Sequence, residues 1–383
     1  MASLYWLGVL VLVVALVRRL FLVPSGLRHL PRVPIFPLLK SYLAMEPEDM
    51  PIRNLILPFA NDRQEGVVLV WVLGKWMVHI LDSQIARQLS DDLALYSKAR
   101  PPNDSLLWHL IGNSNILVSN STQWKKQSRL INDAINLQMP VKQFALLGPG
   151  TNTVRWDEFA QRFAVDALGS TVFGHDFEAL KQQSMFVREY NWVMAGIANP
   201  IYLIAPTLID RIDTLIEQFV ALLKAKQNSP GDDMMSYMLR DPDIASALST
   251  LFYLLATHPD IQRRAREEIA TIIDPKADFT AENLAANSLP FLNACIREAL
   301  RINLSQRFQT ESLKNWVPFA LGPRQCPARN FAMYEQRALA AVLLREYEWE
   351  LPAGSKHAKA VQNAFSPFAL TLPHELNLTF RKL

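Results

Sequence analysis

The feature that most restricts the fold of this chain is an unbroken apolar run near the N-terminus, LYWLGVLVLVVALV, from Leu4 to Val17. Two arginines and a second short apolar stretch follow it. One helix from Leu4 to Val23 would be about 30 Å long at ~1.5 Å per residue, which is the thickness of a bilayer core. We therefore expect residues 1–23 to form a transmembrane signal anchor. A cleaved signal peptide is the alternative, because a run of this length also fits its hydrophobic region.

The charges around this run predict its orientation. No lysine or arginine precedes the run, whereas Arg18, Arg19 and two further arginines follow it. Because basic residues stay on the cytosolic side of a membrane, the body of the chain is expected to face the cytosol. The chain has two cysteines, which agrees with a reducing compartment. Four prolines predict a stiff, non-helical hinge over residues 24–40.

Residues 41–383 are expected to form one body that is mainly α-helical with a minor β-sheet. The sequence of residues 67–81 predicts a β-hairpin with Gly74 at its turn. The net charge of +3, without a long basic run, gives no indication of nucleic-acid binding. Helices are predicted where apolar residues recur at steps of three and four, with a break at His258-Pro259 and a strand-like tail at the end of the chain. These stretches are residues 156–174, 245–270, 289–302 and 328–347.

The stretch PFALGPRQCPARNFAMYEQ contains the residues whose types suggest chemistry. Pro327 favours the first position of a helix, so Cys326 is expected beside a helix N-terminus, where a thiolate is stabilised. Gly322 permits a tight loop, Arg324 offers a planar charge to a carboxylate, and Phe319 can shield the sulfur from water. A shielded thiolate with these neighbours suits an axial ligand of haem iron. The alternative is that Cys326 is a small buried hydrophobic residue.

The string Phe-x-x-Gly-x-Arg-x-Cys matches the haem-binding loop of the cytochrome P-450 family, which the chain resembles over nearly all its length. Glu298-x-x-Arg301 resembles the family's Glu-x-x-Arg signature, a structural brace beneath the haem, and residues three apart on a helix can pair. TQWKKQSRL resembles the haem-flanking helix, in which Trp124 would reach a haem propionate, with core packing as its alternative. The family places a basic residue where this chain has Ser128, and Arg129 is the neighbouring substitute.

The resemblance implies an incomplete cytochrome P-450 fold behind an N-terminal transmembrane helix. It implies that Cys326 is the catalytic iron ligand. The residues that it implies for haem (iron protoporphyrin IX) binding are Phe319, Gly322, Arg324, Cys326, Trp124 and Arg129. Trp108, Leu110 and Phe365 match regions that line the family's substrate pocket, and core packing is their alternative.

The implied activity is that of a haem-thiolate monooxygenase of the membrane-anchored, microsomal type, with a fungal-like sequence. Such an enzyme inserts one oxygen atom of O2 into a lipophilic substrate. Electrons come from NADPH through NADPH-cytochrome P-450 reductase, with cytochrome b5 as a second candidate donor. The implied location is the endoplasmic reticulum membrane, crossed once. The reductase would dock on a basic surface formed by Lys125, Lys126, Arg129, Arg329 and Arg337.

The chain departs from the family pattern in its loop and its central helix. Ala328 stands where the family usually has glycine, which is a mild change. The family's central helix carries an acid and a hydroxyl residue that relay protons during the reduction of dioxygen. Asp243 and Ile244 stand at the hydroxyl positions in this chain, and Pro242 is expected to end or kink the helix just before them. Ser249 and Thr250 lie too far along the helix to be assumed as substitutes.

A second departure is the short connection between Arg301 and Phe319, where seventeen residues intervene. The family needs several strands, a meander and a further arginine in this interval, and Arg307 is the candidate for that arginine. Lost segments of this kind suggest dropped exons or a faulty gene model. The alternatives to a working monooxygenase are therefore a haem-binding but catalytically impaired product, a haem-thiolate isomerase or peroxide user, and a membrane-anchored helical scaffold without haem.

Overall fold

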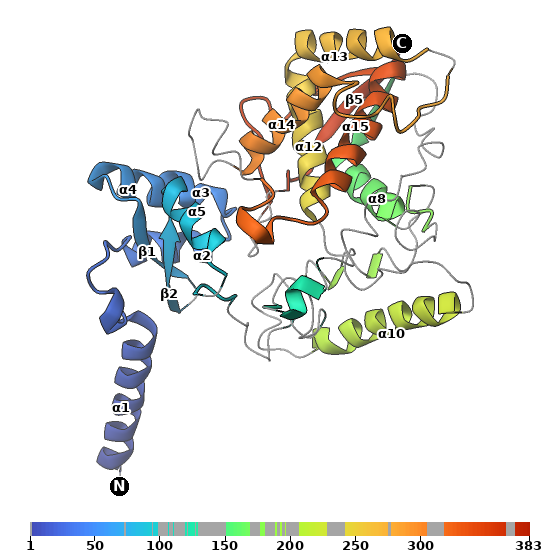
Figure 1. Cartoon of the computed structure of the whole chain (residues 1–383). Coiled ribbons are helices and arrows are strands. Elements are labelled where there is room, and N and C mark those ends of the chain that lie inside the picture. Colours follow the sequence, from blue (N-terminus) through green and yellow to red (C-terminus); the bar gives the residue numbers. More distant parts are fainter. Residues whose placement is uncertain are drawn as a thin grey trace.

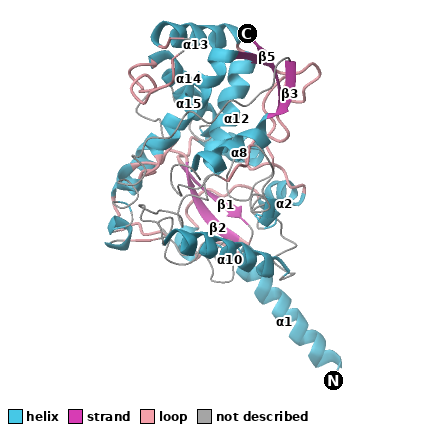
Figure 2. Ribbon diagram, turned by 90° about the vertical axis from the view of Figure 1, so that its right-hand side faces the viewer, coloured by secondary structure: helices cyan, strands magenta, loops and turns pink. Residues whose placement is uncertain are grey.

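The structure, a computed structural model, is mostly helical with two small antiparallel sheets (Figures 1 and 2), as expected for a mainly α fold with a minor sheet. It describes residues 2–72, 74–93, 95–98, 106, 110, 119–120, 122–126, 128, 151–168, 177–180, 188–189, 192–193, 196, 207–227, 242–274, 277–304, 318–364 and 372–383.

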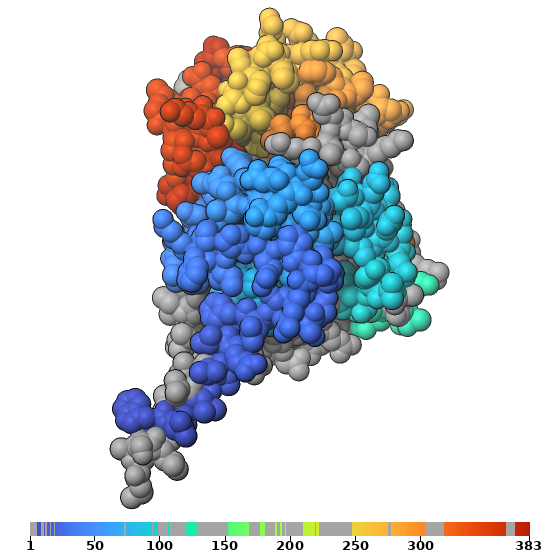
Figure 3. Space-filling view, turned by 90° about the vertical axis from the view of Figure 1, so that its left-hand side faces the viewer, coloured from blue at the N-terminus to red at the C-terminus, as the bar shows by residue number. Residues whose placement is uncertain are grey.

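The N-terminal elements form a unit with a small core of its own. Its members are α1 (Ala2–Phe21), η1 (Ser25–Leu27), α2 (Ile35–Leu43), α3 (Asp49–Pro51), η2 (Ile52–Ile56), α4 (Leu57–Arg63), β1 (Val67–Val72), β2 (Lys75–Ile80) and α5 (Ser83–Asp91). Apolar residues of β1, α2, η2 and α4 pack together in its core. Helix α1 projects from the body in Figures 1 and 3. Among the described residues, no helix combines the length and the hydropathy that a membrane crossing requires.

The predicted non-helical hinge over residues 24–40 is wrong in its second half, because α2 begins at Ile35. Pro34 precedes the first helical residue, and Pro37 lies within the first turn. A proline is tolerated there, since the first N–H groups of a helix have no partner within the helix. The prolines therefore start this helix, and do not keep the segment extended.

The predicted hairpin is confirmed, and it holds the end of α1. Gly74 has a φ of +88° at the turn, a conformation that favours glycine. The indole N–H of Trp71 donates to the carbonyl oxygen of Leu20 at 2.8 Å, and that of Trp76 donates to the carbonyl oxygen of Phe21 at 3.0 Å. The rings of Phe21 and Trp71 also stack, with centroids 5.3 Å apart. The last turn of α1 is thus fixed to the sheet.

Helix α12 lies at the centre of the larger C-terminal body, where it contacts α8, α13, α14 and α15 (Figure 2). The predicted break is confirmed, since α12 ends at Thr257 and α13 begins at Pro259. The described elements of this body are β3 (Thr151–Arg155), α8 (Trp156–Leu168), α12 (Pro242–Thr257), α13 (Pro259–Ile272), α14 (Pro290–Leu304), η8 (Gly322–Arg324), α15 (Arg329–Glu346), β4 (Tyr347–Glu350) and β5 (Asn377–Lys382). Helix α10 (Thr207–Gln227) lies apart from this group in Figure 1.

A three-stranded antiparallel sheet in the order β3-β5-β4 closes one side of the helical core. Phe380 in β5 lies opposite Asn152 in β3 and Trp349 in β4. Its ring joins a buried aromatic cluster with Trp349, Phe252 and Trp156, in which neighbouring ring centroids are 4.1–5.4 Å apart. Such contacts stabilise a core beyond the area that they bury, so residues more than 200 positions apart in sequence are held together.

Candidate functional site

The loop before α15 is closed by its own backbone. The N–H of Cys326 donates to the carbonyl oxygen of Phe319 at 2.8 Å, and the N–H of Gln325 donates to that of Gly322 at 3.1 Å. Cys326 and Phe319 are both half-buried, and neither cysteine of the chain forms a disulfide. The phenyl side chain packs against the main hydrophobic core, so the loop is attached to the helical body at the residue where it starts.

The predicted position of Pro327 as the first residue of the following helix is wrong. Helix α15 begins at Arg329 with Ala328 as its N-cap, so Pro327 lies in the turn before the helix. Ala328 has φ −82° and ψ 5°, a turn conformation that delays the start of the helix. Cys326 still approaches the helix end, because its carbonyl oxygen accepts the N–H of Arg329 at 3.4 Å.

Gly322 presses the loop against the C-terminal end of α5. Its φ is +68°, and a Cβ atom there would lie 2.6 Å from the carbonyl oxygen of Ser90 and 2.9 Å from Asp91 Oδ1. Side chains do not tolerate contacts with backbone at such distances, so only glycine fits without movement. The loop is therefore held between the helical body, through Phe319, and the N-terminal unit, through α5.

Arg324 connects the loop to residues that lie about 200 positions earlier in the sequence. Its Nη2 donates to Asn120 Oδ1 at 2.7 Å, and its Nη1 donates to the carbonyl oxygen of Ser119 at 3.5 Å. Its guanidinium lies over the ring of Trp124, with Cζ 5.6 Å from the centroid. The Nε atom is buried without a hydrogen-bond partner among the described residues. A buried N–H of this kind calls for an acceptor, and the described part of the chain does not supply one.

Lys98 adds a second cation to this place. Its backbone N–H donates to Asn120 Oδ1 at 3.0 Å, and its carbonyl oxygen accepts Asn120 Nδ2 at 3.1 Å. Burial lowers the pKa of Lys98, and the charge of Arg324 lowers it further. In the described part of the chain, no carboxylate forms an ion pair with either cation. Lys98, Arg324 and Trp124 thus form a cation cradle that suits a carboxylate-bearing group beside the Cys326 loop.

Sequence reasoning found Arg324 and Trp124 but missed Lys98 and Asn120. Asn120 lies 204 positions before Arg324, and Lys98 lies 22 positions before Asn120. A motif search cannot find such a pairing, because the Asn120 side chain bonds to the backbone of Lys98 and to the side chain of Arg324, and no sequence spacing encodes these contacts. A basic residue shortly before the haem-flanking helix was the one available signal for Lys98.

Glu298 and Arg301 form the pair that the sequence predicted. Arg301 Nε donates to Glu298 Oε2 at 2.7 Å and Nη2 donates to Oε1 at 2.6 Å, a bidentate arrangement on α14. These hydrogen bonds lower the pKa of the Glu298 carboxyl. The side chains are 52% and 40% exposed, so water screens the pair and its contribution to stability is small. Its role as a haem brace stays a prediction, and its candidate third partner, Arg307, lies outside the described residues.

The predicted basic docking surface is wrong at Arg337. This side chain is buried in α15, where its Nε donates to the carbonyl oxygen of Leu284 at 2.9 Å and its Nη1 donates to Asn293 Oδ1 at 3.0 Å. It ties α15 to the segment before α14 and cannot contact a partner. Of the other members, Lys125 and Lys126 are exposed. Arg329 is half-buried, and Arg129 lies outside the described residues.

Two of the three predicted substrate contacts, Trp108 and Phe365, also lie outside the described residues, whereas Leu110 is half-buried. Helix α12 begins at Pro242, and the residues before it lie outside the described residues, so the predicted end or kink of a helix at Pro242 stays a prediction. Ser249 and Thr250 are 0% and 3% exposed inside the core. The side chains of Asp243 and Ile244 are not among those that the structure describes.

Comparison with known proteins agrees with this geometry. The family model described as Cytochrome P450 matches residues 244–305 and 304–378. Cytochrome P450 monooxygenase cpaH of Aspergillus oryzae is 27% identical, with 29% of this chain and 32% of that protein covered. Cytochrome P450 4A10 of Mus musculus is also 27% identical, with 27% and 30% covered. The chain thus spans about a third of the length of these curated relatives.

Solved structures show the same fold over more of the chain. The heme domain of cytochrome P450DA matches with a TM-score of 0.73 and 16% identity, covering 92% of this chain and 97% of that one. The retinoic acid bound cyanobacterial CYP120A1 matches with a TM-score of 0.67 and 18% identity, covering 92% and 99%. The fold is therefore that of these proteins. The family model matches the part of the chain that holds the Cys326 loop and the helices around it, residues 244–378, so this part resembles the cytochrome P450 family in sequence as well as in fold.

Proposed function

We propose that the chain is a haem-thiolate monooxygenase that oxidises a lipophilic substrate with O2 and with electrons from NADPH. The observation that carries the proposal is the cation cradle of Lys98, Arg324 and Trp124, whose member Arg324 stands two positions before Cys326 in the loop. Haem carries two carboxylates, and the buried Nε of Arg324 offers them an unused donor. The residues present therefore fit haem, with charge at its edge and sulfur at its centre.

Each residue of the loop has a separate task in this proposal. Cys326 supplies the thiolate ligand, and the hydrogen bond from its N–H to Phe319 fixes the position of its backbone. Phe319 keeps water from the sulfur, while Arg324 and Lys98 neutralise the propionates. When bound, haem supplies the activation of dioxygen and the insertion of one oxygen atom into a C–H bond. The protein's part is to hold the cofactor, to admit an apolar substrate and to limit access of water.

For partners and location, we propose NADPH-cytochrome P-450 reductase and, as a second donor, cytochrome b5, at the endoplasmic reticulum membrane. The apolar sequence of α1 and the exposure of Trp6 and Val11 on it support membrane association. The exposed Lys125 and Lys126 follow Trp124 on its helix and offer positive charge to an acidic partner. Full-length protein that washes off microsomes at alkaline pH would contradict the membrane part of this proposal.

The decisive test of the function is the yield of product per electron pair. Purified full-length protein, loaded with haem, is mixed with the reductase, NADPH and a panel of fatty acids and terpenes. We expect NADPH consumption that rises with one substrate class and matches the product formed. If all the NADPH consumed gave hydrogen peroxide and no oxidised substrate, the protein would still be shown to bind haem, but the monooxygenase proposal would be overturned.

The cation cradle gives a separate prediction for cofactor retention. Replacing Arg324 or Lys98 with methionine keeps the length of the side chain and removes its charge. A hydrogen bond to a charged group contributes about 1.5–3 kcal/mol, so each change is expected to speed haem loss by roughly 10–100-fold. Transfer of haem to an excess of a scavenging protein, followed by absorbance, measures this rate.

Lys125→Met is the matched control, since Lys125 is exposed on the same helix as Trp124 and should leave the rate unchanged. The pH dependence adds a second check. Because Lys98 is neutral above its pKa and then no longer attracts a propionate, wild-type protein should lose haem faster as the pH rises through that pKa, and Lys98→Met should lack this rise. Equal rates in wild type and Arg324→Met would show that the cradle does not hold the propionates.

A further inference from the structure

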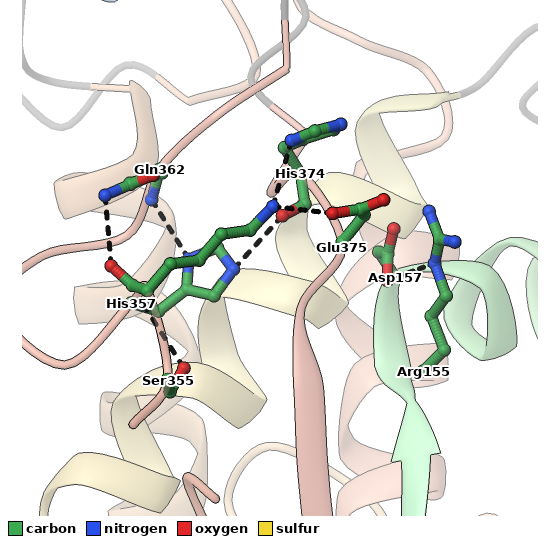
Figure 4. A network of polar contacts seen from close by, with 8 residues as sticks. Arg155, Asp157, Ser355, His357, Gln362, His374 and Glu375 are labelled. Carbon is green, nitrogen blue, oxygen red and sulfur yellow. Dashed lines mark hydrogen bonds and ion pairs between the residues drawn. The ribbon is translucent and has the colours of Figure 1, made fainter. Parts of the chain in front are cut away.

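A buried histidine lies far from the Cys326 loop in sequence, between β4 and the last strand. His357 is 1% exposed, and its ring is held on both sides (Figure 4). The backbone N–H of Gln362 lies 3.1 Å from Nδ1, and the carbonyl oxygen of His374 lies 3.1 Å from Nε2. An N–H can only donate and a carbonyl can only accept. The geometry therefore requires a lone pair on Nδ1 and a proton on Nε2, which is the neutral ring.

These two bonds join two short segments, residues 362–364 and 372–374, which pair in an antiparallel way and are called the base of the hairpin below. The N–H of His374 donates to the carbonyl oxygen of Gln362 at 2.8 Å, and the N–H of Ala364 donates to that of Leu372 at 2.7 Å. The His357 ring thus bonds to both strands of this base, one through each nitrogen. The backbone carbonyl oxygen of His357 accepts a hydrogen bond from the hydroxyl of Tyr253 at 3.0 Å, which fixes the backbone of His357 to α12.

The outer side of the base carries a second set of bonds. Lys356 Nζ donates to Glu375 Oε2 at 2.8 Å and lies 3.0 Å from Nδ1 of His374. Glu375 has a φ of +53°, a left-handed conformation that costs free energy in a residue with a side chain. The base of the hairpin is therefore under backbone strain, and it stays closed only while the surrounding bonds hold it.

Protonation of His357 is incompatible with this arrangement. A proton on Nδ1 would face the N–H of Gln362, so one bond would become a repulsive contact, and a charge would be buried. Burial is the largest cause that lowers the pKa of His357, and the nearby charge of Lys356 lowers it further. The charge of Asp157 and backbone hydrogen bonds at His374 and Glu375 act in the opposite direction.

The other groups around the ring do not reverse this balance. Tyr253 meets the ring edge-on at 6.4 Å, and burial raises the pKa of its hydroxyl, so it stays neutral. Burial also raises the pKa of Asp157, and Arg155 lies 3.6 Å from its carboxylate. The carboxylate of Glu375 is occupied by Lys356. In the described part of the chain, no carboxylate is therefore placed to accept a direct hydrogen bond from a protonated His357.

We propose that neutral His357 is a clasp for the paired segments 362–364 and 372–374 and that its protonation separates them. The clasp closes the two ends of a segment that contains Phe365, a predicted substrate contact. An effect of pH on substrate affinity rests on the proposed function, whereas the opening itself does not.

The sign follows from linkage. An unfolded or opened segment has a histidine of ordinary pKa, about 6.5, whereas the closed clasp disfavours the proton. The stabilisation of the closed form is thus fully present above that pH and falls as the pH drops below it. The equilibrium constant for opening then rises by up to about tenfold for each pH unit. The fall ends once the pH is below the pKa of the closed form.

Hydrogen–deuterium exchange of full-length protein at pH 8 and pH 5.5, corrected for intrinsic rates, measures the opening through the amides of Ala364 and His374. We expect protection in the wild type to fall by about tenfold at the lower pH. His357→Gln, which can still donate and accept but does not titrate, should remove the pH dependence. His374→Gln is the matched control and should keep it, because the bond to His357 uses the backbone of His374.

Three outcomes would overturn the proposal. They are an unchanged protection in the wild type, an equal fall in His357→Gln, and loss of the pH dependence in His374→Gln alone. If His357→Gln fails to fold, the titration of the wild-type imidazoles by NMR decides, because a buried ring that charges at or above the usual pKa cannot act as this clasp. None of these measurements needs haem or substrate, so failure of the clasp is distinguishable from failure of the monooxygenase proposal.

Discussion

Cys326→Ala is expected to abolish the absorption bands of thiolate-ligated haem in full-length protein expressed with haemin. If Cys326 is the iron ligand, as proposed, removal of this sulfur leaves the iron without its thiolate, and the chain has one other thiol. The folded body should survive, because Cys326 is half-buried and its structural bond uses the backbone N–H, which alanine retains. The reduced carbon monoxide spectrum measures the ligand, and the thermal midpoint measures the fold.

Cys295→Ala is the matched control. Burial is the main cause that raises the pKa of Cys295 to about 11, and the charge of Glu268 adds to it. Cys295 therefore carries little thiolate near neutral pH, and it lies on α14 outside the loop of Cys326, so it is not expected to replace Cys326 as a ligand. The control should keep the full spectrum. A thiolate spectrum that survives in Cys326→Ala would refute the assignment of the iron ligand.

The correct predictions from the sequence concern features that a few neighbouring residues determine. The hairpin with Gly74 at its turn, the helices with regular apolar spacing and the break at Pro259 each depend on local backbone preference or on one amphipathic face. The bidentate pair of Glu298 and Arg301 also follows from spacing alone. These features needed no knowledge of which segments of the chain meet.

The errors and omissions have two physical origins. Pro37 and Pro327 were placed by a general preference, but a proline near a helix start fits either the first turn or the turn before it, and the neighbouring dihedral angles decide. Arg337 and Lys98 have their positions set by tertiary partners. Periodicity does not reveal that the carbonyl oxygen of Leu284 receives Arg337, since the two residues lie 53 positions apart.

Strand β3 illustrates the same limit in the fold. Its sequence TNTVR is short and mostly polar, and its β-branched residues alone are too weak a signal to predict a strand. It is a strand because β5 presents an edge to it, with Thr153 opposite Thr379 and their hydroxyls 3.2 Å apart. Pairing partners supplied by the rest of the fold decided its conformation, as β propensity is strongly context-dependent.

Gly322→Ala is expected to be the most damaging single-methyl change in the site. A side chain at a φ of +68° costs about 1–2 kcal/mol by itself. The added Cβ would also lie 2.6 Å from the carbonyl oxygen of Ser90, a backbone atom that cannot rotate away. The loop must then leave the end of α5 and take Arg324 with it. We expect at least tenfold less bound haem in the purified protein, measured as the ratio of Soret to protein absorbance.

Gly354→Ala separates the two causes. Gly354 has a φ of +75°, but a Cβ atom there would meet nothing within 4 Å, so this variant carries the dihedral cost without the contact. It should lose about 1–2 kcal/mol of unfolding free energy and keep its haem. Gly322→Asn offers the reverse separation, since asparagine tolerates a positive φ but still carries a Cβ, and it should lose haem as Gly322→Ala does. If Gly322→Ala and Gly354→Ala retained haem equally, contact with α5 could not be what holds the thiolate loop in place.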